Sequence, residues 1–286
     1  MQAINNTKPK GVLIAIGGAV DAGTPPENEN AENLSAAFLE IGILKRMIQE
    51  LPGKTNRIEI LTTASMIPEE TGQHYIDAFH RLGNTNIDVI HIREKEDVNN
   101  PEYIQRIQRA EGVLMTGGDQ SRLTSIFTNS EILEIMHKRY QKEHFVLAGT
   151  SAGAMAMSSL MILGGSSSEA LLKGTIKTTR GLNFIHEVTF DSHFIKRGRF
   201  GRLFQTVAAN PSILGIGLGE DTGLLITEGD HMEAIGSGLV VIVEGNHIEY
   251  TNIAEIEDGD PISIENLHVH VLSKGHNYLL SARKMA

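Results

Sequence analysis

The sequence contains no cysteine and no tryptophan, and aromatic residues make up only 5% of its 286 residues. Without cysteine the chain cannot form disulfides, thiolate metal sites or iron–sulfur clusters, and it has no cysteine nucleophile. Any covalent catalysis must therefore use another side chain. A chain of this length buries roughly three quarters of the surface that it exposes when unfolded, so a large core forms without covalent cross-links.

Basic residues are also scarce, because 25 Lys and Arg face 35 Asp and Glu and the formal net charge is −10. This balance argues against nucleic acid or an anionic membrane as the main partner. No apolar stretch approaches about 18 residues, the length of a membrane-spanning helix. The apolar run at 12–16 is too short for a signal peptide. We therefore expect a cytoplasmic protein that binds neither nucleic acid nor membrane.

Short apolar runs alternate with amphipathic stretches over the first half of the chain. The run at 11–16 is continuously apolar, and the stretch at 32–51 carries apolar residues at helical spacing before Pro52-Gly53. Further strands are predicted at 57–61, 87–92, 112–115 and 144–148, with helices at 69–82, 101–110, 121–127 and 132–140. This alternation predicts an α/β fold with a mostly parallel sheet covered on both faces. Ligand sites in such sheets lie at the carboxyl ends of the strands.

The pattern changes after residue 221, where short strands are separated by Gly, Asn and Asp turns. These strands are predicted at 223–227, 233–235, 239–243, 262–264, 268–272 and 278–280. No long polar linker precedes them. We therefore expect residues 1–286 to form a single α/β domain, in which residues 223–286 are an antiparallel β-rich extension packed on the main sheet.

The segment Gly149-Thr-Ser-Ala-Gly153 lies between a predicted strand and a predicted helix. This G-x-S-x-G pattern, in this context, is typical of a nucleophile on a tight strand-to-helix turn, where only small neighbours fit. The start of the following helix supplies free amides and a partial positive charge where an oxyanion would form. A turn that merely ends a strand is the alternative, and the context favours Ser151 as a nucleophile.

A serine nucleophile needs a base, and twelve histidines are available. His193 is the best placed, because it follows a predicted strand at 187–190 downstream of the Ser151 turn. His268 and His270 share one face of a strand and make at most half a metal site, so we predict no metal. Two acids, Glu220 and Glu169, could orient His193, and the residues alone do not choose between them.

Three arginines follow His193 closely, in a chain that is acidic overall: Arg197, Arg199 and Arg202. The dipole of a first helical turn disfavours cations, so three arginines there indicate an anion site, most simply for a substrate carboxylate. Another loop, Thr116-Gly-Gly-Asp-Gln120, follows a strand and opens a helix. Its glycines expose amides as an oxyanion hole or a phosphate cradle does, although it lacks the P-loop pattern.

Taken together, these segments make the sequence similar to the peptidase E and cyanophycinase family of serine peptidases. The matching segments run through nearly the whole chain: Ile16-Gly-Gly-Ala19, Thr63-Ala-Ser65, Thr116-Gly-Gly-Asp-Gln120, Gly149-Thr-Ser-Ala-Gly-Ala154, Asp191-Ser-His-Phe194, the three arginines and Gly215-Ile-Gly-Leu-Gly-Glu-Asp-Thr222. The resemblance implies a class I glutamine-amidotransferase-like (flavodoxin-like) three-layer α/β fold. A serine there replaces the amidotransferase cysteine, in agreement with the absence of cysteine here.

The resemblance also implies roles for individual residues. Ser151 would be the nucleophile, His193 the general base and acid, and Glu220 the acid that orients the histidine. Glu169 matches another acidic position associated with the family's active site. Positions that match the family's substrate pocket are Gln120, Asp191, Ser192, Arg197, Arg199 and Arg202. Ser192 departs from the glutamine that cyanophycinases typically carry, which affects substrate contact rather than the chemistry.

The implied substrate is cyanophycin, a poly-aspartate backbone with an arginine on each β-carboxyl, which would be cut to β-Asp-Arg dipeptides without a cofactor. Amides of Gly118, Asp119 and Ala152 would form the oxyanion hole. A homodimer is also implied. One alternative is a dipeptidase for aspartyl or isoaspartyl dipeptides, as in peptidase E. A non-catalytic peptide-binding α/β module would lack one of the catalytic residues, and all are present.

Overall fold

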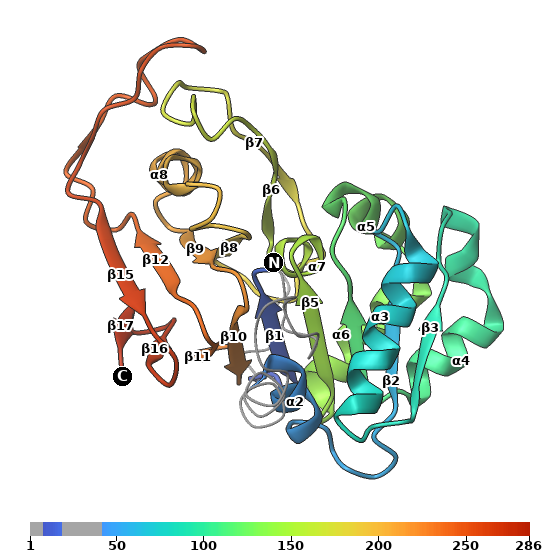
Figure 1. The fold of residues 1–286 in the computed structure, drawn as a ribbon. Coiled ribbons are helices and arrows are strands. Elements are labelled where there is room, and N and C mark those ends of the chain that lie inside the picture. The colour runs from blue at the N-terminus through green and yellow to red at the C-terminus, as the bar shows by residue number, and fades with distance from the viewer. Residues whose placement is uncertain (1–7, 19–41) are drawn as a thin grey trace, which may run out of the picture.

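Five parallel strands form the centre of the main sheet in the order β1, β5, β4, β2, β3 (Figure 1). The computed structural model describes residues 8–18 and 42–286. The strands are β1 (Val12–Ile16), β2 (Ile58–Leu61), β3 (Ile87–Ile90), β4 (Gly112–Met115) and β5 (Val146–Thr150). Four of them are buried along their whole length, as continuous apolar runs in a sheet covered on both faces require.

Helices cover both faces of this sheet, so the predicted layered α/β fold is confirmed. They are α2 (Ile43–Gln49), α3 (Pro68–Arg81), α4 (Pro101–Arg109), α5 (Gln120–Phe127), α6 (Glu131–Lys142), α7 (Ala152–Met157) and α8 (Phe200–Ala209), with a 3₁₀ helix η1 (Lys95–Asn99). Alternate residues of β1 face opposite layers, because side chains alternate along a strand. Ile14 belongs to the buried cluster that includes residues of α2 and α3, whereas Leu13 belongs to the cluster that includes residues of α5, α6 and α7. The predicted helix at 32–51 lies partly outside the described residues.

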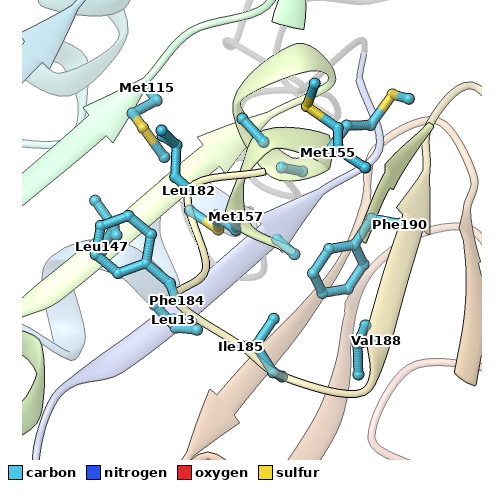
Figure 2. Close-up of a cluster of buried hydrophobic side chains, with 14 of the residues drawn as sticks. Leu13, Met115, Leu147, Met155, Met157, Leu182, Phe184, Ile185, Val188 and Phe190 are labelled. Carbon is cyan, nitrogen blue, oxygen red and sulfur yellow. The ribbon is translucent and has the colours of Figure 1, made fainter. Parts of the chain in front are cut away.

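The short helix α7 is buried along its whole length. Figure 2 shows Met155 and Met157 of α7 among aromatic and aliphatic side chains that include Phe184 and Phe190. Unbranched methionines fill irregular gaps between such neighbours. Because α7 begins directly after residue 151, this packing fixes the turn that precedes it.

Strands after residue 221 extend the main sheet itself. β10 (Thr222–Thr227) pairs antiparallel with β1, and β11 (His231–Gly236), β16 (Asn277–Leu279) and β17 (Lys284–Met285) continue from it. The sequence led us to expect an antiparallel segment here, and in the structure these four strands continue the sheet from β1 through antiparallel pairs. They complete a nine-stranded sheet in the described chain.

A second, four-stranded sheet has the order β15, β12, β9, β8. Its strands are β8 (Val188–Asp191), β9 (Leu214–Leu218), β12 (Val240–Glu244) and β15 (His268–Leu272). Two small pairs complete the described strands: β6 (Leu160–Gly164) with β7 (Lys177–Arg180), and β13 (Tyr250–Thr251) with β14 (Ile264–Glu265).

The two sheets meet where β1, β5, β8 and β9 end. The amide of His193, after β8, donates to the carbonyl of Gly17, after β1, at 3.1 Å. The amide of Ser151, after β5, donates to the carbonyl of Ile16 at 2.8 Å. Three strand ends from two sheets are thus tied together by backbone hydrogen bonds.

Candidate active site

Ser151 occupies a sharp turn between β5 and α7, with φ 50° and ψ −105°. Non-glycine residues rarely adopt a positive φ, and such strain is found preferentially at functional sites. The turn depends on small neighbours: a Cβ on Gly149 would collide with the backbone of Gly153, and a Cβ on Gly153 would collide with that of Met115. The glycines of the G-x-S-x-G pattern therefore meet a steric need.

His193 lies between Ser151 and an acid. Its Nε2 is 3.0 Å from the Ser151 Oγ, and its Nδ1 is 2.9 Å from Oε1 of Glu220. The serine hydroxyl can donate to Nε2 while Nδ1–H donates to the carboxylate, which is the order that a nucleophile, a base and an orienting acid need. Ser151 comes from the main sheet, whereas His193 and Glu220 follow β8 and β9 of the second sheet.

Gly18 was missed as a site residue in the sequence. A Cβ at this position would collide with the His193 ring, and its φ of +134° also favours glycine. Its carbonyl accepts the amide of Asp221 at 2.9 Å. The position after the first apolar strand was the available signal, since strand ends build the site in such sheets.

Glu169 lies away from this arrangement. Its side chain is exposed and makes no hydrogen bond or ion pair with any residue that the structure describes. Its carbonyl accepts from the Thr175 hydroxyl at 3.0 Å, within its own loop. Of the two acids left open by the sequence, the structure brings Glu220 to His193 and leaves Glu169 in a neighbouring loop.

Two of the three expected oxyanion donors are available. Gly118 has φ +140°, and its amide donates to no described residue. Ala152 is the first residue of α7, where helical amides have no intrahelical acceptor. The expectation for Asp119 is corrected, because its amide donates to the Ala64 carbonyl at 3.0 Å. Its carboxylate caps α5 through the amide of Ser121.

A cleft of about 420 Å³ opens on one side of Ser151. We call it the arginine cleft, because Arg197, Arg199 and Arg202 line it together with Gln120. Arg197 is exposed to solvent, whereas Arg202 is buried. The Gln120 side chain is held in place because its amide donates to the carbonyls of Ile162 and Leu163. The three arginines and Ser151 line the same cleft, so it presents cationic groups close to the nucleophile.

Asp191 lies behind the arginine cleft and is completely buried. Arg199 Nη1 is 3.0 Å from one carboxylate oxygen, and Arg202 Nε is 2.9 Å from the other. Burial raises the pKa of Asp191, and the two guanidinium groups oppose that shift. The sequence placed Asp191 in the substrate pocket, and the structure corrects this, because the carboxylate positions two arginines instead of facing the cleft.

Ser192 is buried between the nucleophile and α7. Its Oγ is 3.2 Å from the Ser151 Oγ and 3.3 Å from Sδ of Met155. The side chain also lines the arginine cleft. Its hydroxyl thus forms part of the hydrogen-bond network of the nucleophile.

A second cleft, of about 480 Å³, also reaches Ser151 and is bordered by α3, whose residues do not line the arginine cleft. We call it the α3 cleft. Ile67, Glu70 and His74 contribute to it, and Ser151 and His193 line both clefts. None of the α3 residues was singled out in the sequence, because an amphipathic helix gives no signal of which cleft it borders.

The described residues contain no group of three or more His, Cys, Asp or Glu side chains that could hold a metal ion. His268 stacks on His247, and His270 lies 3.6 Å from Glu244. Within residues 8–18 and 42–286, none of the helices combines the length and the hydrophobicity that a membrane span requires.

Comparisons with known proteins show the family of this chain. The profile of peptidase family S51 matches residues 40–235. A cyanophycinase of Trichormus variabilis is 34% identical over 96% of this chain and 87% of its own, and one of Geminocystis herdmanii is 34% identical over 82% and 87%. The fold is similar to that of a peptidase from an acI-B1 Actinobacterium, with a TM-score of 0.64 and 24% identity over 84% of this chain and 93% of that one. The chain therefore belongs to peptidase family S51, a family of serine peptidases.

Proposed function

We propose that this chain is a serine exopeptidase that hydrolyses cyanophycin to β-Asp-Arg dipeptides. The observation that carries the proposal is the hydrogen-bonded series Ser151, His193 and Glu220 at the mouth of the arginine cleft. The cyanophycinases among its relatives support the choice of substrate.

In the proposed mechanism the Ser151 Oγ attacks the backbone carbonyl carbon while Nε2 of His193 takes its proton. Amides of Gly118 and Ala152 stabilise the oxyanion, and Glu220 stabilises the imidazolium. His193 then gives its proton to the leaving amine as the C–N bond breaks. Water, deprotonated by the same imidazole, cleaves the serine ester and restores the free hydroxyl.

The arginine cleft suits the carboxylates of this substrate. Each arginine side group of cyanophycin carries a free carboxylate, and guanidinium groups bind carboxylates through paired, charge-assisted hydrogen bonds. Arg197 is exposed and unpaired with any described residue, whereas Arg199 and Arg202 are held in place by Asp191. A cleft that holds its cations in fixed positions loses little entropy when it binds an anion.

The arginine cleft would also accept an aspartyl or isoaspartyl dipeptide, because such a substrate carries carboxylates as well. Products should therefore be identified by mass spectrometry after incubation with cyanophycin and, separately, with a panel of aspartyl dipeptides. We expect β-Asp-Arg from the polymer. Cleavage of dipeptides without cleavage of the polymer would favour the dipeptidase instead.

Ser151→Ala tests the nucleophile directly. We expect this variant to release no β-Asp-Arg above background while it keeps the circular dichroism spectrum of the wild type, because Ala removes only the attacking oxygen. Ser125→Ala, on the exposed side of α5, is the matched control and should retain full activity. Polymer turnover by Ser151→Ala would refute the mechanism.

We further propose that the enzyme works as a homodimer in the cytoplasm and needs no cofactor. Its family resemblance supports the dimer, and its acidic balance supports a function away from nucleic acid and anionic membranes. Analytical ultracentrifugation should give one species of twice the monomer mass, and a monomer at micromolar concentration would contradict the dimer.

A further inference from the structure

The two clefts that meet at Ser151 carry opposite charge. The arginine cleft is lined by three guanidinium groups and by no carboxylate among its described residues. In the α3 cleft, Glu70 is the one lining residue of fixed charge in the described chain, and Lys and Arg are absent from that lining. A substrate bound across Ser151 thus passes from a cationic site to an anionic one.

Helix α3 holds its side of the cleft in a fixed position. The Tyr75 hydroxyl donates to Oγ1 of Thr150, the residue before the nucleophile, at 3.2 Å. Thr71 Oγ1 lies 2.8 Å from the hydroxyl of Ser65. The helix is therefore anchored both to the strand end that carries Ser151 and to the preceding loop.

Glu70 is free to bind a ligand. Its side chain is exposed on the cleft side of α3 and makes no hydrogen bond or ion pair with any described residue. A carboxylate in a cleft whose described lining holds no competing Lys or Arg attracts a positively charged ligand. Guanidinium is the cation whose planar pair of donors fits a carboxylate best.

A serine peptidase binds the acyl and leaving-group parts of its substrate on opposite sides of the nucleophile. His193 borders both clefts, so a leaving amine in the α3 cleft is within reach of the imidazole that protonates it. If the arginine cleft takes the acyl unit, the unit that departs must lie in the α3 cleft.

We propose that the α3 cleft is the leaving-group subsite and that Glu70 selects a unit with a guanidinium side group. This inference rests on the proposed function, because that function supplies the arginine on the departing unit. It adds a specificity residue that the nucleophile, the base and the arginine cleft do not include.

The test uses two synthetic oligomers of two β-Asp-Arg units, one with arginine and one with citrulline on the unit that supplies the leaving amine. Citrulline keeps the shape of arginine and removes the charge. We expect Glu70→Gln to lower kcat/KM for the arginine oligomer by about five- to twentyfold, as expected for a charge-assisted hydrogen bond at a partly solvated site, and to leave the citrulline oligomer unchanged.

Glu69→Gln is the matched control, since Glu69 is an exposed acid of the same helical turn that does not line the cleft. It should cleave both oligomers at the wild-type rate. An equal loss on both oligomers in Glu70→Gln, with an active wild type, would overturn this inference alone. A wild type that cleaves neither oligomer would overturn the proposed function and the inference with it.

Discussion

Glu220 and Glu169 are carboxylates of one chain with very different surroundings. Glu220 accepts from the His193 ring at 2.9 Å, whereas Glu169 is exposed in a loop. We expect Glu220→Gln to lower kcat about 100- to 10,000-fold, because an amide neither fixes the imidazole tautomer nor stabilises the imidazolium. Glu169→Gln should stay within a few-fold of the wild type. Steady-state rates on cyanophycin check both, and equal small losses would mean that neither acid orients His193.

A substitution of Ser192 tests the hydrogen bond that this residue can make to the nucleophile. Its hydroxyl lies 3.2 Å from the Ser151 Oγ, so it can donate to the nucleophile while Ser151 donates to His193. Removing one neutral hydrogen bond costs about 0.5–1.5 kcal/mol. We therefore expect Ser192→Ala to lower kcat about two- to tenfold with KM unchanged. A change in KM alone would instead show that Ser192 contacts the bound substrate.

The sequence identifies a single site residue correctly when the pattern around that residue is required by the local backbone. The glycines around Ser151 are needed by the turn itself, so the pattern identifies the residue. Partners that meet only in the tertiary structure are different: nothing local distinguishes Glu220 from Glu169. The Asp119 prediction was wrong because its amide bonds to Ala64, 55 positions earlier in the numbering.

At the scale of elements, apolar runs and helical periodicity predicted the parallel strands and most of their helices, because these patterns follow directly from burial. Strand pairing after residue 221 was not predictable in the same way. An alternating pattern shows that a segment is a strand and does not name its neighbour. β10 pairs with β1, which is more than 200 residues away, and β12 pairs with β9 in another sheet.

Glu111 shows how one carboxylate fixes the entry to a strand. Just before β4, it accepts hydrogen bonds from the amides of Lys54, Thr55 and Asn56 and from the Thr55 hydroxyl, in the turn that leads to β2. Burial raises the pKa of this carboxyl, but the hydrogen bonds outweigh it and hold the pKa below its usual 4.5. The stabilisation is therefore present above about pH 4.5 and is lost as pH falls through the folded-state pKa.

Glu111→Gln should reduce the free energy of unfolding by about 1–3 kcal/mol at neutral pH, because Gln keeps one acceptor oxygen and its NH2 group would face backbone amides that the carboxylate accepts from. The difference from the wild type should shrink below about pH 4.5, where the unfolded-state carboxyl begins to bind protons, and should level off below the folded-state pKa. Urea unfolding across pH 3–7 measures this. Glu255→Gln, at an exposed position, is the control and should give no such pH-dependent difference. A pH-independent loss would show that Glu111 acts through packing alone.

At the scale of the whole molecule, the site exists only where the two sheets meet. The nine-stranded sheet supplies Ser151 and Gly18, and the four-stranded sheet supplies His193 and Glu220. The amide of Gly17 donates to the Thr222 carbonyl at 2.8 Å, which ties the start of β10 to the same point. The strands that follow residue 221 therefore support the catalytic geometry, and a change far from Ser151 in this segment should act on the entire fold.

A substitution of Tyr278 tests whether the C-terminal strands and the site unfold as one cooperative unit. It lies in β16, is completely buried and pairs in register with Met232 of β11. If residues 223–286 belong to one cooperative domain, calorimetry should show a single transition, and Tyr278→Ala should shift all of it by about 3–5 kcal/mol, or roughly 5–10 °C. Tyr250→Ala, with half of the side chain exposed, should cost under about 1 kcal/mol. Activity should disappear with the same midpoint as the heat signal. Two separate transitions, with only one moved by Tyr278→Ala, would mean that the C-terminal strands unfold independently of the site.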